Sequence, residues 1–120
     1  MIEQYTYNKS SATLKLLKEL EFAILSNSFE YDYMYPLRTI IRYYGVSDRT
    51  ASNAIGILQE LQVLEPVKGK GLRIHPDSKT FLIQRRTEIF KHELINLLKD
   101  TTLLNLTRND IDQIIDHFFN

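Results

Sequence analysis

The chain has 120 residues, of which 43% are hydrophobic and 25% are charged, so its composition excludes a disordered chain and is that of a folded globular protein. It contains no cysteine, which excludes disulfides, thiol catalysis and cysteine-bound zinc. Basic and acidic residues balance, 15 against 15, so a surface for nucleic acid has to arise from the local placement of cations and not from an overall basic charge.

The first ten residues lack the basic start and the apolar run of a secretory signal. No apolar stretch approaches the ~20 residues that a membrane-spanning helix needs. We therefore expect a soluble protein that works in the cytoplasm.

The first expected helix runs from about residue 11 to residue 25. Ser10 or Ser11 can cap its N-terminus, and the polar sequence at residues 26–28 ends it. Its apolar residues recur at steps of three and four, which places them on one helical face. These residues are Leu14, Leu17, Leu20, Ala23 and Ile24.

Two further helices are expected around a glycine-containing turn. Pro36 suits the start of a helix over about residues 37–44, and Gly45 permits the left-handed conformation that ends it. Ser47 is a good N-cap for the next helix. That helix has a buried stripe made of Ala51, Ala54, Ile55, Leu58 and Leu61. A short helix, a glycine turn and a second helix form the helix-turn-helix layout.

The period of the pattern then changes from helical to extended. Residues 63–67 predict a short strand, residues 68–71 a hairpin turn, and residues 72–75 the returning strand. Pro66 is tolerated only at an edge of such a sheet. A β-hairpin that follows a helix-turn-helix is a wing.

Two more helices are expected in the remaining chain. One covers about residues 79–98, and the other begins after Thr107, which with Asp110 resembles a capping box. The two helices carry more apolar residues than they can bury against each other, and such a surplus usually marks an interface, although packing on the first helix of the same chain would also use it. The expected dimer interface consists of Leu82, Ile89, Phe90, Leu94, Leu97, Ile114, Ile115, Phe118 and Phe119.

The expected fold is therefore mainly α with one small β-hairpin. A winged helix-turn-helix domain occupies residues 1–76, and a two-helix C-terminal dimerisation tail occupies residues 77–120.

Signs of catalysis or of metal binding are weak. Asp112 and Asp116 share a helical face from which His117 turns away, and no recognised ligand spacing occurs. No glycine-rich phosphate loop opens a helix, and no nucleophile–base pair can be named. We expect no catalytic residue, no metal site and no cofactor.

Residues 34–74 resemble, without a gap, the DNA-binding domain of the GntR family of bacterial repressors. Met34-Tyr35-Pro36 stands where the family usually has Leu-Pro-Ser, and Arg38 stands at the arginine of its second helix. Gly45-Val46-Ser47 matches the Gly-Val-Ser turn of the family. The other matches are Thr50, Ala54 and Leu58 in the recognition helix and Gly69-Lys70-Gly71 at the wing tip.

The resemblance implies a transcription regulator. Most members of the family carry a large effector-binding C-terminal domain, whereas residues 77–120 have room for two helices. This arrangement is similar to the YtrA-like subfamily, in which a two-helix tail mainly dimerises the protein. The resemblance therefore implies a homodimeric repressor that binds a palindromic operator in double-stranded DNA. It does not indicate an effector.

The expected DNA contacts follow from helix-turn-helix geometry. The N-terminal residues of the recognition helix reach base edges, the preceding helix crosses the phosphate backbone, and the wing contacts the backbone or the minor groove. The expected contact residues are Arg38 and Arg42 on the second helix, Ser47, Asp48, Arg49, Thr50, Ser52 and Asn53 on the recognition helix, and Lys68, Gly69, Lys70 and Arg73 on the wing.

The recognition helix departs from the family pattern at two places. Asp48 and Ser52 stand where members typically have arginine. Phosphate repels an aspartate at this place, although a carboxylate can accept a hydrogen bond from cytosine N4. The alternative role of Asp48 is to stabilise the helix N-terminus. The neighbouring Arg49 can replace part of the lost positive charge.

Other interpretations remain open. Arg38 could instead form a salt bridge to Glu30 or Asp32, and the tyrosines between residues 31 and 44 could pack together or line a pocket. The winged helix could serve as a protein-interaction module, or it could belong to a plasmid replication or partition protein that binds repeated DNA elements. An enzyme is the most distant alternative.

Overall fold

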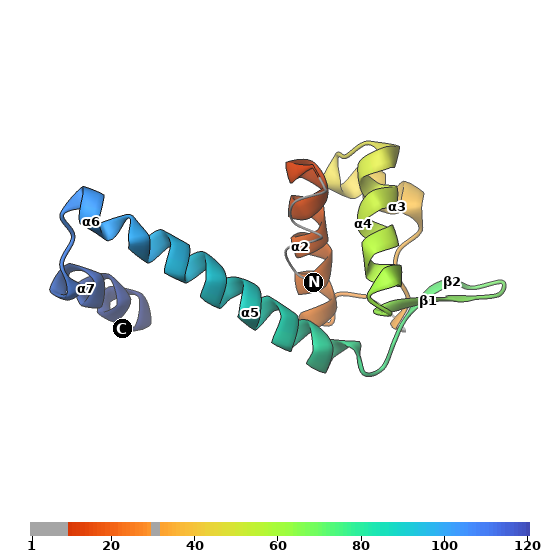
Figure 1. Ribbon diagram of the computed structural model, residues 1–120. Coiled ribbons are helices and arrows are strands. Elements are labelled where there is room, and N and C mark those ends of the chain that lie inside the picture. The colour runs from red at the N-terminus through yellow and green to blue at the C-terminus, as the bar shows by residue number, and fades with distance from the viewer. Residues whose placement is uncertain (1–9, 30–31) are drawn as a thin grey trace. The chain divides into compact units, whose positions relative to one another are not determined.

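The computed structural model describes residues 10–29 and 32–120 (Figure 1). The chain is mainly α with one two-stranded antiparallel sheet, as predicted. The elements are, in order, α2 (Ser11–Leu25), α3 (Leu37–Tyr44), α4 (Asp48–Glu60), β1 (Leu64–Val67), β2 (Gly71–Ile74), α5 (Ser78–Lys99), α6 (Thr101–Leu104) and α7 (Arg108–Phe119).

Two compact units divide the chain, Met1–Arg85 and Arg86–Asn120. The first unit includes the beginning of α5 as well as the helix-turn-helix and the hairpin. The predicted domain boundary between residues 76 and 77 falls just before α5, and as a boundary between functional parts it stays a prediction.

Helix α2 begins at a serine cap. The Ser10 hydroxyl oxygen accepts a hydrogen bond from the Thr13 backbone N–H at 3.2 Å, which satisfies one of the free donors of the first turn. Ser10, and not Ser11, is therefore the cap. The fully buried face is rotated slightly from the predicted one, because Leu14 and Ala23 are only half-buried. It consists of Thr13, Leu16, Leu17, Leu20, Glu21 and Ile24.

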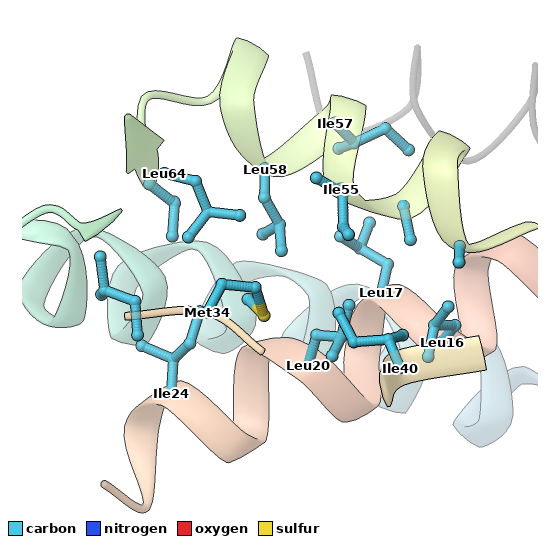
Figure 2. Packing of buried hydrophobic residues seen from close by; sticks show 14 of the residues in the cluster. Leu16, Leu17, Leu20, Ile24, Met34, Ile40, Ile55, Ile57, Leu58 and Leu64 are labelled. Atoms are coloured by element: carbon cyan, nitrogen blue, oxygen red, sulfur yellow. The ribbon is translucent and has the colours of Figure 1, made fainter. Parts of the chain in front are cut away.

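The core of the first unit lies between α2 and α4. Figure 2 shows the apolar side chains of both helices gathered between them, with Ile40 of α3 and Met34 of the preceding segment beside them. Val63, Leu64 and Ile74 add the base of the hairpin to the same cluster. Burial of these side chains stabilises the packing by roughly 1.5–3 kcal/mol for each large aliphatic residue.

The wing is a regular antiparallel hairpin. Its register pairs Leu64 with Ile74 at the base and Val67 with Gly71 near the tip. The segment before α3 is tied to the wing, because the Met34 backbone N–H donates to the Leu72 carbonyl at 2.8 Å. This bond holds the wing in place relative to the start of α3.

A buried ion pair joins α2 to α5, and the sequence analysis did not predict it. Arg85 Nε lies 2.9 Å from Glu21 Oε1, and the two side chains are 6% and 0% exposed. One turn earlier, Leu82 is also fully buried and belongs to the core. The expectation that Leu82 lies in a dimer interface is therefore wrong, because the first unit of the same chain already covers its side chain.

The second unit contains the rest of α5 with α6 and α7. The predicted capping box of α7 is present: the Thr107 backbone N–H donates to Asp110 Oδ2 at 2.8 Å, and the Asp110 backbone N–H donates to the Thr107 hydroxyl at 3.2 Å. The short helix α6 was not predicted. None of the residues 86–120 is fully buried within the single chain.

Candidate nucleic-acid interface

The turn between α3 and α4 has the geometry that the sequence predicts. Gly45 ends α3 with φ 64° and ψ 38°, a left-handed conformation in which glycine meets no steric penalty. Ser47 then caps α4: its hydroxyl oxygen accepts from the Thr50 backbone N–H at 3.1 Å and lies 3.0 Å from Thr50 Oγ1. The hydroxyls of Ser47 and Thr50 are thus engaged with each other at the start of the recognition helix.

The outward face of α4 carries the other predicted contact residues. Asp48, Arg49 and Ser52 are exposed, and Asn53 is half-exposed. Residues three and four positions apart share one side of a helix, so Arg49, Ser52 and Asn53 form one polar face. The core residues Ala51, Ala54, Ile55 and Leu58 lie on the other side. This face is therefore available to a partner.

Helix α3 adds two cations. Arg38 and Arg42 are four residues apart, which places them on one side of the helix, and both are exposed. No ion pair joins either side chain to another described residue, so the alternative pair of Arg38 with Asp32 is not observed. Glu30, the other alternative partner, lies outside the described residues.

The wing tip presents a third group of cations. Lys68, Gly69 and Lys70 are exposed, and the positive φ of 79° at Gly69 is a conformation that favours glycine. Arg73, nearer the base, lies 3.7 Å from the carboxylate of Glu65. Its charge is therefore partly neutralised, whereas Lys68 and Lys70 make no ion pair with another described residue.

A recess joins the recognition helix to the wing. Its volume is about 400 Å³, and Ser52 and Gln59 of α4 line it together with Lys70 and Leu72 of the hairpin. Predicted contact residues that lie far apart in the sequence, Ser52 and Lys70, thus border one hollow. Between residues 32 and 76, lysine and arginine outnumber the acids six to four, so positive charge is locally in excess in a chain that is neutral overall.

Two tyrosines at the end of α3 differ in their surroundings. Tyr44 packs against the core, and its burial raises the pKa of its phenol, with a smaller contribution from Glu19. Tyr43 stacks edge-to-face on Tyr44 with ring centroids 4.8 Å apart, yet it is 79% exposed. From the sequence, packing and a pocket lining were both open for these tyrosines. The position of Tyr43 directly after Arg42, at the turn before the recognition helix, is the feature of the sequence that could have indicated its exposure.

A metal site and a membrane-spanning helix are both absent from the described part of the chain. No three histidine, aspartate or glutamate side chains among the described residues lie close enough together to hold a metal ion. Within residues 10–29 and 32–120, no helix combines the length and the apolarity that a membrane crossing requires.

Comparison with solved structures identifies the fold. A GntR family transcriptional regulator from Listeria monocytogenes superposes with a TM-score of 0.72 at 18% identity, over 92% of this chain and 96% of the other. A transcriptional regulator from Oenococcus oeni matches with a TM-score of 0.68 at 14% identity, over 94% of both chains. No family model and no curated protein matches the sequence.

A third solved structure contains DNA. It is S. agalactiae BusR in complex with its busAB promoter DNA, with a TM-score of 0.55 at 24% identity over 92% of this chain and 56% of the other. The chain therefore has the winged-helix fold of GntR-type transcription regulators, and the resemblance in its sequence is confirmed at the level of the fold.

Proposed function

We propose that this protein is a transcription regulator that binds double-stranded DNA in a sequence-specific manner. The observation that carries the proposal is the set of exposed cations on three elements of one winged helix, Arg38 and Arg42 on α3, Arg49 on α4, and Lys68 and Lys70 on the wing. Cations that form no intramolecular ion pair can neutralise phosphates, and the release of the phosphate counterions then drives binding. Promoter DNA bound to BusR, a chain of the same fold, supports this use of the surface.

Each element has its own role in the proposal. The exposed face of α4 enters the major groove, where Arg49, Ser52 and Asn53 reach base edges. Arg38 and Arg42 contact the phosphates that α3 crosses, and Tyr43 lies beside them. Lys68 and Lys70 contact the backbone or the minor groove beside the recognition helix.

Asp48 places a carboxylate on the face of α4 that is proposed to enter the major groove. Its carboxylate accepts hydrogen bonds and cannot donate them, so among the base edges of the major groove it prefers the amino groups of cytosine or adenine. Its negative charge also favours the N-terminus of α4. We expect its partner position in the DNA to be a cytosine.

The second unit supports a homodimer. Phe90, Leu94 and Leu97 recur at helical spacing along α5 and are 64%, 42% and 65% exposed. On α7, the side chains of Ile114, Ile115, Phe118 and Phe119 are exposed as well. A second copy of the chain is the occupant proposed for this apolar face, with Ile89 at its edge. Apolar surface of this extent is rare on monomeric proteins.

The proposed mechanism is occlusion of a promoter in the cytoplasm. A two-fold symmetric dimer places its recognition helices in successive major grooves, about one helical turn apart, so the operator is a palindrome. A bound dimer then prevents transcription. This repressor needs no cofactor and performs no catalysis.

The experiment that tests DNA binding is a titration of one labelled duplex at two salt concentrations. We expect the logarithm of the association constant to fall with the logarithm of salt, because counterions are released. Arg49→Ala lowers the affinity by about tenfold or more, whereas Lys15→Ala, which removes an exposed cation of α2, leaves the affinity unchanged. Equal affinities of these two variants and of the unchanged protein would contradict the proposed interface.

A protein-interaction module is the second candidate. The exposed carboxylate of Asp48 at the start of α4 and the overall net charge of 0 favour it. Such a module would bind its partner with little dependence on salt and without DNA. The salt titration therefore separates the two functions.

A further inference from the structure

A second hollow lies behind the recognition helix, where three elements of the first unit meet. Its volume is about 650 Å³, which is within the range of small-molecule pockets. The end of α4, the base of the hairpin and the first turn of α5 all contribute to its wall. Leu61, Leu64, Pro66 and Phe81 give it an apolar lining.

A buried hydroxyl in the wall of this hollow has no hydrogen-bond partner among the described residues. Ser78 is only 4% exposed, and its Oγ makes no hydrogen bond to any other described residue. A buried polar group without a partner is costly, and in native proteins it calls for a specific explanation. Because Ser78 lines the hollow, a ligand held there can supply the missing hydrogen bond.

The charges of the lining indicate the class of ligand. Among the described residues that line the hollow, Glu65 and Asp77 are acidic, and none is lysine or arginine. The Nδ1 atom of His75, which also lines the hollow, accepts a hydrogen bond from the Asp77 backbone N–H at 3.2 Å. Arg73 pairs with Glu65 from outside the lining, which leaves Asp77 as the main negative charge.

An aromatic ring completes the site. Phe81 lies on α5 one turn after Ser78, lines the hollow and is 39% exposed. The face of an aromatic ring attracts cations. The partial positive charge at the N-terminus of α5 opposes this attraction, and the Asp77 carboxylate directly before the helix offsets it.

We propose that this hollow binds a small organic cation, an amine with an apolar body. The ammonium group pairs with Asp77, the apolar body packs on Leu61 and Phe81, and a polar group of the ligand bonds to Ser78 Oγ. The ligand would connect the end of the recognition helix, the wing and the start of α5. All residues of the site belong to the first unit, and the proposal does not require that the protein binds DNA.

The test is a titration of the full-length ¹⁵N-labelled protein with three matched probes, followed by NMR. Benzylamine, benzyl alcohol and benzoate share a ring but are cationic, neutral and anionic. We expect benzylamine to cause saturable shifts at residues 59–66 and 75–81 with a Kd of about 1 mM or tighter. Benzyl alcohol should bind at least about tenfold more weakly, and benzoate should cause no saturable shift.

Variants decide whether the named residues form the site. Ser78→Ala and Asp77→Asn should each weaken benzylamine binding by about tenfold, while Asp100→Asn, which removes an exposed acid outside the hollow, should not change it. Absence of saturable shifts up to about 10 mM benzylamine would overturn the proposal. Equal binding of the three probes, or unchanged binding in both pocket variants, would overturn it as well.

Discussion

At the scale of single residues, Glu21 and Arg85 are the pair with the largest energetic consequence. Both charges are removed from water, so each depends on the other for compensation. Loss of the Glu21 carboxylate leaves the buried guanidinium of Arg85 without this ion pair. Loss of both, with apolar side chains in their place, removes the desolvation cost together with the attraction.

We predict that Glu21→Ala lowers the free energy of unfolding by about 3–5 kcal/mol, as measured by urea denaturation. The double variant Glu21→Met/Arg85→Met should recover most of this loss. Glu19→Ala, on the exposed side of the same helix, is the matched control and should change stability by less than about 0.5 kcal/mol. If Glu21→Ala behaves like the control, the ion pair does not hold α5 to α2.

Asp110 provides a residue-scale prediction about pH. The Thr107 backbone N–H, and then the Thr107 side chain, hold the pKa of its carboxyl below the ordinary value of 3.8. A depressed pKa means that the capping contribution to α7 is complete above pH 3.8 and is lost as the pH falls through the folded-state value. A carbon NMR titration of the Asp110 carboxyl should give a midpoint below 3.8; a midpoint at or above it would contradict the capping geometry.

At the scale of elements, local signals in the sequence were sufficient for most of the first unit. Ser10 and Ser47 cap α2 and α4, and Gly45 ends α3 in a left-handed conformation, because each of these roles depends only on neighbouring backbone. The hairpin followed from the change of period and the glycines at its tip. Periodicity could not assign a partner to Leu82, since the same apolar stripe suits a core or a dimer.

Contacts between residues far apart in the chain could not be predicted from the sequence, for a physical reason. Glu21 and Arg85 are 64 residues apart, and charged side chains on amphipathic helices are usually solvated. Only the packing of α2 against α5 reveals that both are buried. Helix-turn-helix geometry assigns the candidate DNA-contacting residues by position, and their contacts with DNA stay a prediction. The pairing of Arg73 with Glu65 and the exposure of Tyr43 could be found only from the structure.

The wing makes an element-scale prediction about DNA. Lys68→Ala/Lys70→Ala removes two exposed cations from the hairpin tip. If both contact phosphate, the affinity should fall for all duplexes to a similar extent, and the slope of log K against log salt should decrease by about 2. Lys15→Ala/Lys18→Ala, which removes two exposed cations from α2, is the control. An unchanged slope in the lysine variant would mean that the wing lysines do not contact phosphate.

At the scale of the whole molecule, the proposed homodimer depends on the exposed apolar face of the second unit. Ile115→Glu places a charge within this face and should raise the dimer dissociation constant by about 30-fold or more, measured by analytical ultracentrifugation. Leu103→Glu is the matched control, because Leu103 is 85% exposed on α6 and is not among the proposed interface residues. Dimers of equal stability in both variants would place the interface elsewhere.

Selection of binding sites from a library of random DNA duplexes shows whether this winged helix reads DNA. We expect enrichment of a palindrome whose half-sites lie about one helical turn apart, with the preference at one position of each half-site altered in Asp48→Asn. No enrichment above background, from protein that is folded and dimeric, would contradict the claim that this winged helix reads DNA.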